Sequence, residues 1–336
     1  MPIKKASRAE SNEDRLIERH FKPIASQPGA LGLIDDAAML TLPPGHDLVV
    51  TADAIVGGVH FFLDDPADAI ARKALRVNLS DLAAKGARPA GFLLSLALPK
   101  SVREPWLKGF ALGLGNDAKR YNCPLLGGDT VRTPGPLMVS VVAFGTLPSG
   151  TMVRRDGARV GDHVLVTGTI GDAALGLKLR RDGNAARRWK LSAGERAHLT
   201  RRYLTPEPRN VLAFAVRKYA TAAMDVSDGL AGDVGKLCRA SGVAAVIDAA
   251  RVPLSAAGRT ALKAERKLIV TALSGGDDYE IVCTVRPARL ASFQAAARAL
   301  GVPVADIGRI VRGSGASFRQ PDGKALRFAR ASFSHF

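Results

Sequence analysis

The sequence predicts a protein of two mixed α/β domains. Its 336 residues are too many for one small core, and a hydrophobic content of 47% is ample for two domains of ordinary size. Strand-like and helix-like segments alternate along both halves, which is typical of α/β proteins. Residues 147–162 are polar and rich in turn-forming residues, so we place the boundary there and expect domains over residues 1–150 and 151–336.

The first half contains three clear apolar strands and two helices. We expect strands over residues 46–53, 91–98 and 137–145, and helices within residues 65–89 and 104–121. In the first helix Asn78, Asp81 and Lys85 share a face at i, i+3, i+7 spacing. Asp81 is therefore placed to point toward a site beside that helix.

The second half begins with a strand–loop–helix unit over residues 163–177 and continues with helical segments to about Tyr219. A strand then ends near Asp225, and a helix follows Gly229, with Ser227 or Asp228 as its expected cap. Further segments follow in order: a strand at 244–249, a loop at 273–280, a strand and a helix, and a hairpin indicated by the turn at 321–323.

The charge balance is strongly basic, with 48 Lys and Arg against 31 Asp and Glu. Such a balance suits nucleic acid, an acidic membrane or small anionic substrates. The densest basic run, residues 178–202, also carries acids, and we interpret it as a solvated helical arm rather than a nucleic-acid patch. An aromatic content of 5% leaves few platforms on which bases could stack.

The sequence shows neither a signal peptide nor an apolar run long enough to cross a bilayer, so we expect a soluble cytoplasmic protein. We expect neither a nucleic-acid nor a membrane partner. Cys123, Cys238 and Cys283 are far apart and lack metal-binding spacing, and we interpret them as small core residues.

Acidic residues recur in loops and at predicted strand ends, often beside glycine: Asp35, Asp36, Asp53, Asp81, Asp129, Asp225, Asp228, Asp277 and Asp278. Oxygen ligands without His or Cys partners suit Mg²⁺, which is usually shared between carboxylates and substrate phosphates. For Asp228 the helix cap is an equally good explanation. The common phosphate motifs are missing, and the loop from Gly168 to Gly176 is as well explained by a plain strand–helix turn as by a phosphate cradle.

Seven motifs in this order resemble the thiamine-monophosphate kinase family of the aminoimidazole-ribonucleotide-synthetase-like superfamily. They are GLIDDAAML, TADAIVGGVHF, KALRVNLSDLAAKGARP, GGDTVR, RRDGARVGD, DVSDGL and LSGGDDYE. The resemblance runs from about Leu31 to the C-terminus. It implies an N-terminal α/β domain that dimerises through its sheet, a C-terminal α+β domain, and ATP bound in a cleft between them.

The resemblance also implies roles for individual residues. Several Mg²⁺ ions would be held by Asp36, Thr51, Asp53, Asp81, Asp129, Asp225 and Asp228. ATP would contact Gly128, Asp129, Arg155 and Ser227. Thiamine monophosphate would contact His60, Asp277 and a C-terminal aromatic residue, either Phe328 or Phe333.

This sequence departs from the family pattern at four positions: Ile34 and Ser332 replace Gly, Ala52 replaces Thr, and Asp277 replaces Glu. Asp277 keeps the charge but has a shorter reach than the family Glu.

We therefore expect a homodimeric enzyme that uses ATP and Mg²⁺ to phosphorylate thiamine monophosphate by direct in-line transfer, giving thiamine diphosphate and ADP. The acceptor is a phosphate oxygen that is already anionic near neutral pH, so we expect no general base, and we expect His60 to bind substrate. The alternatives are another ATP-using enzyme of the superfamily, selenophosphate-synthetase-like or amidine-forming, and a basic nucleic-acid-binding protein.

Overall fold

The computed structural model describes residues 15–332, which form two compact units. Unit 1 comprises residues 15–42, 52–74 and 90–143, and unit 2 comprises residues 43–51, 75–89 and 144–332. The division falls within single elements, because helix α2 (Ala67–Ala84) and strand β1 (His46–Val56) contribute residues to both units. The second half of α2, which carries Asp81, thus belongs to unit 2.

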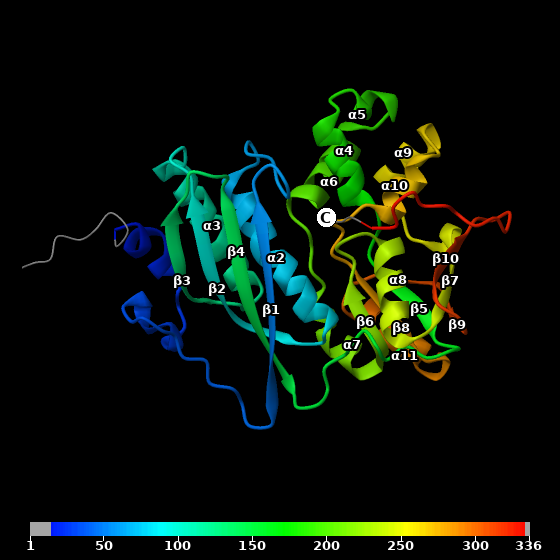
Figure 1. The fold of residues 1–336 in the computed structure, drawn as a ribbon, viewed down its shortest axis with the longest axis horizontal. Coiled ribbons are helices and arrows are strands. Elements are labelled where there is room, and N and C mark those ends of the chain that lie inside the picture. Colours follow the sequence, from blue (N-terminus) through cyan, green and yellow to red (C-terminus); the bar gives the residue numbers. More distant parts are fainter. Residues whose placement is uncertain (1–14, 333–336) are drawn as a thin grey trace, which may run out of the picture. The chain divides into compact units, whose positions relative to one another are not determined.

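The first sheet has four strands in the order β1-β4-β2-β3. The other strands are β2 (Arg88–Leu98), β3 (Leu125–Arg132) and β4 (Met138–Pro148). Strands β2 and β3 are parallel, with Ser95 opposite Asp129. Helices α2 and α3 (Glu104–Arg120) lie behind the strands in Figure 1, and three short helical turns precede β1: η1 (Ile17–Phe21), η2 (Lys22–Ile24) and η3 (Pro28–Leu33).

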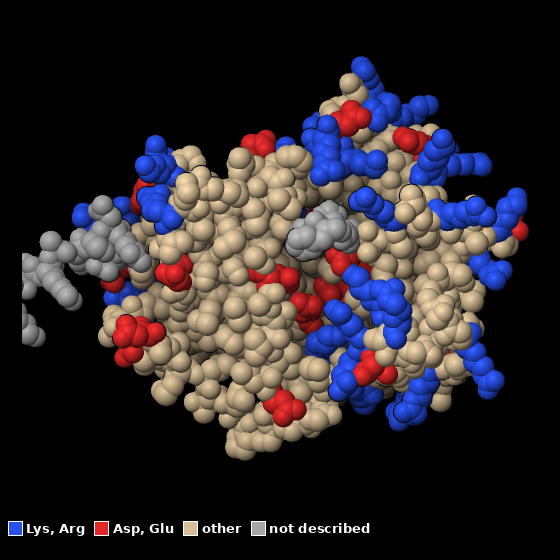
Figure 2. All heavy atoms as spheres, viewed as in Figure 1, with Lys and Arg blue, Asp and Glu red and all other residues tan. Residues whose placement is uncertain are grey.

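The face of the first sheet turned toward the viewer is almost free of charged side chains. Figure 2 shows a broad surface with few Lys, Arg, Asp or Glu side chains over strands β1 to β4. Large apolar side chains are exposed on these strands, among them Leu48 and Val50 on β1 and Val131 on β3, with exposed fractions of 42%, 54% and 49%. An exposed apolar surface of this kind is typical of an interaction site.

The second sheet lies in unit 2 and has six strands in the order β10-β7-β9-β5-β8-β6. The strands are β5 (His163–Thr167), β6 (Ala220–Asp225), β7 (Ala244–Asp248), β8 (Ile281–Val285), β9 (Val304–Val311) and β10 (Gly315–Arg319). Neighbouring strands are antiparallel except β10 and β7, which are parallel.

The helices of unit 2 are α4 (Asp172–Arg181), α5 (Ala185–Arg188), α6 (Ala193–Leu204), α7 (Ala213–Tyr219), α8 (Leu230–Ser241), α9 (Ala256–Ala264), α10 (Leu268–Ser274) and α11 (Pro287–Ala299), with short turns η4 (Asn210–Leu212) and η5 (Ala249–Arg251).

Helices cover both faces of the second sheet. Successive side chains along a strand point to opposite faces, so each strand contributes to both cores. Val164 and Val166 of β5 pack with α8 on one face, and Leu165 packs with α7 and α11 on the other. The three cysteines are free and buried, as the sequence predicts. Within residues 15–332 no helix is both long enough and apolar enough to cross a membrane.

The predicted mixed α/β architecture is confirmed, and each strand and helix expected from the sequence forms close to its expected position. The expected C-terminal hairpin forms only in part. Strand β10 and the segment after the turn are joined by an isolated bridge between Arg319 and Ala325 and by the hydrogen bond from the Leu326 amide to the Phe318 carbonyl at 2.8 Å.

Candidate functional site

The structure distributes the predicted site residues over both units. Unit 1 contains Asp36, Asp53, His60, Gly128 and Asp129. Unit 2 contains Thr51, Asp81, Arg155, Asp225, Ser227, Asp228, Asp277 and Phe328. Phe333 lies outside the described residues. Unit 2 therefore contains four predicted metal ligands, Arg155 as a predicted ATP contact and Asp277 as a predicted substrate contact.

The second half of α2 is fixed within unit 2 by side chains that donate hydrogen bonds to backbone carbonyl groups. The pairs are Arg76 to Pro206 at 2.9 Å, Asn210 to Leu79 at 2.9 Å, Lys85 to Ala223 at 2.8 Å and Ser80 to Tyr279 at 3.5 Å. These contacts join α2 to β6 and to the loop before β8. Because helix, strand and loop each carry a predicted site residue, the contacts also set the position of Asp81.

Asp81 and Thr51 meet directly. The Thr51 hydroxyl donates to Oδ2 of Asp81 at 2.6 Å. Both side chains are half-buried and offer oxygen atoms only. Their contact places two of the predicted metal ligands, from β1 and α2, side by side.

Two loops pair through their backbones beside Asp225, which ends β6 and is 3% exposed. The Val226 amide donates to the Glu280 carbonyl at 2.7 Å, and the Asp277 amide donates to the Ser227 carbonyl at 2.8 Å. A Cβ at Gly276 would lie 2.3 Å from the Ser227 carbonyl oxygen. Close packing of the two loops, rather than close approach to a ligand, therefore explains this glycine.

Asp277 and Tyr279 adopt positive φ angles of 74° and 51°. Residues other than glycine rarely adopt this backbone conformation, and those that do cluster at functional sites. The backbone pairing with residues 226 and 227 holds both residues in place. This local geometry is compatible with a ligand-contacting role for Asp277.

The expected cap of α8 is wrong. Gly229 is the N-cap residue, and it has no side chain to cap the helix. Instead Oδ2 of Asp233, within the first turn, accepts from the Asp228 amide at 3.0 Å. A φ of 113° at Gly229 turns the chain into the helix, so the Asp228 carboxylate is not used as a cap and forms an ion pair with Lys236.

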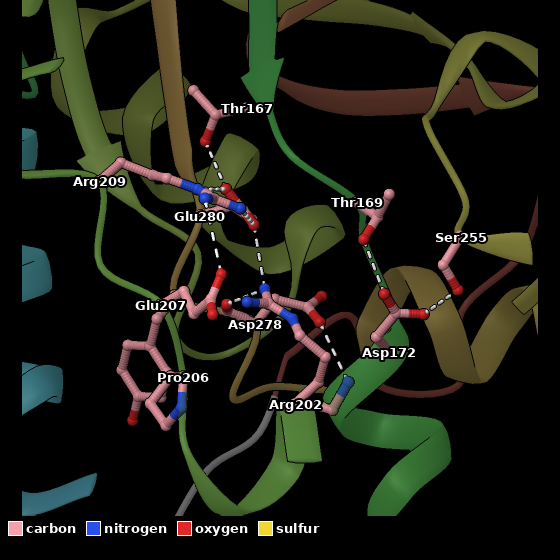
Figure 3. A network of polar contacts seen from close by, with 12 residues as sticks. Thr167, Thr169, Asp172, Arg202, Pro206, Glu207, Arg209, Ser255, Asp278 and Glu280 are labelled. Atoms are coloured by element: carbon pink, nitrogen blue, oxygen red, sulfur yellow. Dashed lines mark hydrogen bonds and ion pairs between the residues drawn. The ribbon is translucent and has the colours of Figure 1, made fainter. Parts of the chain in front are cut away.

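A buried ionic network holds the loop that carries Asp277, and the sequence analysis did not predict it. Figure 3 shows Glu280, which has no exposed side-chain surface, between two guanidinium groups. Glu280 accepts from Arg202 at 2.9 Å, from Nε of Arg209 at 2.6 Å and from the Thr167 hydroxyl at 2.7 Å. These partners lie 71 to 113 residues away in the chain.

Asp278 closes the neighbouring glycine-rich loop. Its carboxylate accepts from the amides of Gly171 at 2.7 Å and Ala173 at 3.3 Å, at the start of α4 (Figure 3). Burial raises the pKa of Asp278 well above 3.8. The amide groups at this helix terminus are thus already used by a side chain, which favours the plain strand–helix turn over the phosphate cradle.

In unit 1, the hydrogen bonds of His60 define its tautomer. The Val56 amide donates to Nδ1 of His60 at 3.0 Å, and the Lys73 ammonium donates to the His60 carbonyl at 3.0 Å. When the ring is neutral its proton is therefore on Nε2, which makes Nε2 a donor. A donor suits contact with a phosphate oxygen.

Asp53 and Asp129 are exposed at the surface of the first sheet. Gly128 precedes Asp129 on β3, and a Cβ at this position would lie 1.9 Å from the Leu94 carbonyl oxygen. Only glycine therefore fits at position 128.

Phe328 packs edge-on against Phe318 with ring centroids 5.5 Å apart, which gives this aromatic residue a structural role in the unit 2 core.

The donor atoms around Asp81 and Asp225 fit Mg²⁺ better than zinc, since they are hydroxyl and carboxylate oxygens. Among residues 15–332 no group of three or more His, Cys, Asp or Glu side chains is already assembled to hold a metal ion. Mg²⁺ commonly takes one or two carboxylates and completes its shell with water and substrate phosphates. The residues present are compatible with binding of that kind.

Comparison with known proteins identifies both halves of the chain. Residues 34–147 match the N-terminal domain of AIR synthase related proteins, and residues 159–319 match their C-terminal domain. The thiamine-monophosphate kinase of Caulobacter vibrioides is 44% identical over 305 residues, which are 90% of this chain and 84% of that protein.

Solved structures of similar proteins support the same family. The thiamine-monophosphate kinase of Stenotrophomonas maltophilia K279a superposes with a TM-score of 0.82 at 41% identity, covering 93% of this chain and 96% of that one. The structure of AaThiL complexed with AMPPCP and TMP gives a TM-score of 0.75 at 31% identity, covering 92% and 97%.

Proposed function

The chain belongs to the thiamine-monophosphate kinase family, and we propose on that basis that it transfers the γ-phosphoryl group of ATP to the phosphate of thiamine monophosphate, giving thiamine diphosphate and ADP. The observation that carries this proposal is the similarity to kinases of this name over nearly the whole chain. Residues 1–150 would bind ATP and Mg²⁺ and form the dimer, and residues 151–336 would complete the site. We propose that the enzyme acts in the cytoplasm, where ATP is abundant.

Charge neutralisation is the main chemical task in this reaction, because both reactants are anions. We propose that Mg²⁺ ions held by Asp36, Thr51, Asp53, Asp81, Asp129, Asp225 and Asp228 supply positive charge to the phosphates. Gly128, Asp129, Arg155 and Ser227 would contact ATP. The protein's own residues then align donor and acceptor, and no residue needs to remove a proton, since the acceptor phosphate is already ionised near neutral pH.

A coupled assay for ADP, with and without thiamine monophosphate, tests the proposal. We expect ATP turnover that depends on both thiamine monophosphate and Mg²⁺, with thiamine diphosphate as product. ATP turnover without that acceptor would contradict the proposal and favour another ATP-using enzyme of the superfamily.

For His60 we predict a binding role toward the acceptor phosphate. Removing the Nε2–H donor in His60→Ala should raise the KM for thiamine monophosphate about tenfold and change the turnover number much less. His60→Gln, whose amide can supply a donor near the same place, should show a smaller rise. If His60→Ala instead lowers turnover about a thousandfold and removes a titration from its pH profile, His60 is a general base.

We also predict a homodimer formed through the uncharged face of the first sheet. Val50 is 54% exposed on this face, and Val50→Glu places a charge there. Light scattering should give twice the chain mass for the parent protein and the single-chain mass for Val50→Glu. Val160→Glu is the control, because Val160 is equally exposed but lies outside the sheet. A monomeric parent at micromolar concentration would disprove the prediction.

A further inference from the structure

Lys85 follows α2 directly and points its ammonium group at the end of β6. Nζ donates to the Ala223 carbonyl at 2.8 Å, two residues before Asp225. An ammonium group has three donors, and within the described part of the chain this is the one hydrogen bond that Lys85 makes through its side chain. Lys85 therefore has donor capacity left for a ligand.

Backbone hydrogen bonds fix the surroundings of Lys85. The Val153 amide donates to the Lys85 carbonyl at 3.2 Å, and the Ala223 amide donates to the Arg154 carbonyl at 3.1 Å. The end of α2, the end of β6 and residues 153–155 are thus joined into one substructure of unit 2. Since Asp81, Asp225 and Arg155 lie on these three segments, Lys85 lies among predicted ATP and metal residues of unit 2.

A second cation, the guanidinium group of Arg155, lies near Lys85. The pKa of the Lys85 ammonium is lowered from 10.5 to about 8, first by burial and second by the Arg155 guanidinium. Asp225, Asp81 and Asp156 oppose this effect. The Arg155 side chain is exposed and forms no ion pair within residues 15–332. Two neighbouring cations repel each other, and an anion bound to both relieves that repulsion.

We propose that Lys85 is a second phosphate-binding cation, which together with Arg155 holds a phosphate group of the nucleotide. This proposal rests on the proposed kinase function and adds a nucleotide-binding residue to it. The ammonium group acts as a compact point charge with rotatable donors, which suits a phosphate oxygen. Its bond to the Ala223 carbonyl directs it to the side of the site where Asp225 lies.

The test compares Lys85→Met with Lys85→Arg. Methionine keeps the length and packing of the side chain but removes its charge, so the KM for ATP and the dissociation constant of ATP should rise about ten- to a hundredfold. The KM for thiamine monophosphate should stay within about twofold. Lys85→Arg restores a cation and should recover most of the ATP affinity. Lys263→Met, an exposed lysine on α9 of the same unit, is the control for loss of one charge.

Wild-type ATP affinity in a folded Lys85→Met protein would overturn the proposal. Equal increases in both KM values, without rescue by Arg, would also overturn it, since they would indicate a general structural effect. Failure of the kinase function is recognised separately, because the wild-type protein would then show no turnover that depends on thiamine monophosphate. Direct binding of ATP still tests Lys85 in that case.

Discussion

An Asp53→Asn enzyme should lose turnover by roughly a hundred- to a thousandfold while remaining folded. Asp53 lies on β1, two residues after Thr51, so the two side chains lie on the same face of the strand. We propose both as ligands of Mg²⁺, and Asn keeps the shape of Asp but removes the charge that attracts the ion. The carboxylate is exposed, so its replacement should change the free energy of unfolding little.

Asp47→Asn is the matched control for this prediction. Asp47 lies on the same strand, and its Oδ2 accepts from the Gly150 amide at 2.8 Å, a bond that the amide oxygen of Asn can keep. We expect wild-type turnover from this variant. A titration with Mg²⁺ completes the experiment. Weaker metal binding in Asp53→Asn should raise the Mg²⁺ concentration that gives half-maximal turnover. Turnover near that of the wild type at low Mg²⁺ would remove Asp53 from the proposed ligand set.

Secondary structure near the site could be predicted because it depends on local patterns. The apolar run before Asp225 and the helical spacing that begins at Leu230 define β6 and α8 from neighbouring residues alone. The same local information gave a wrong cap for α8. The helix instead begins after Gly229, and Asp233 within its first turn accepts from the Asp228 amide.

The buried ionic network that holds the loop of Asp277 could not be predicted, since its residues are distant from one another in the chain. Glu280 is one residue among many acids in the sequence, and no spacing indicates that Arg202 and Arg209 will surround it. Similarly, no local pattern indicates that Gly276 packs against the Ser227 carbonyl, as it does in the structure. Such roles become visible only when the two loops are placed side by side.

The largest effect on stability should come from Glu280→Gln. Its carboxylate is fully buried, and the side chains of Arg202 and Arg209 are only 6% and 19% exposed. Glutamine has nearly the same volume but leaves both guanidinium groups without their buried counter-charge. Removing one partner of a buried ion pair costs about 3–5 kcal/mol, far more than an exposed pair contributes. We therefore expect a loss of about 3 kcal/mol or more in the free energy of unfolding, measured by urea denaturation.

Asp322→Asn provides the comparison, because the ion pair of Asp322 with Lys324 is 52% and 79% exposed and should contribute less than about 1 kcal/mol. The network also explains why the effect should reach the site. Glu280 follows Asp277 by three residues and ends the loop that pairs with residues 226 and 227, so loosening it should disturb the strained backbone at Asp277. Below the denaturation range, Glu280→Gln should consequently show a raised KM for thiamine monophosphate. A Glu280→Gln protein as stable as Asp322→Asn would mean that the two arginines find solvent or other acceptors, and that the buried carboxylate does not hold this loop.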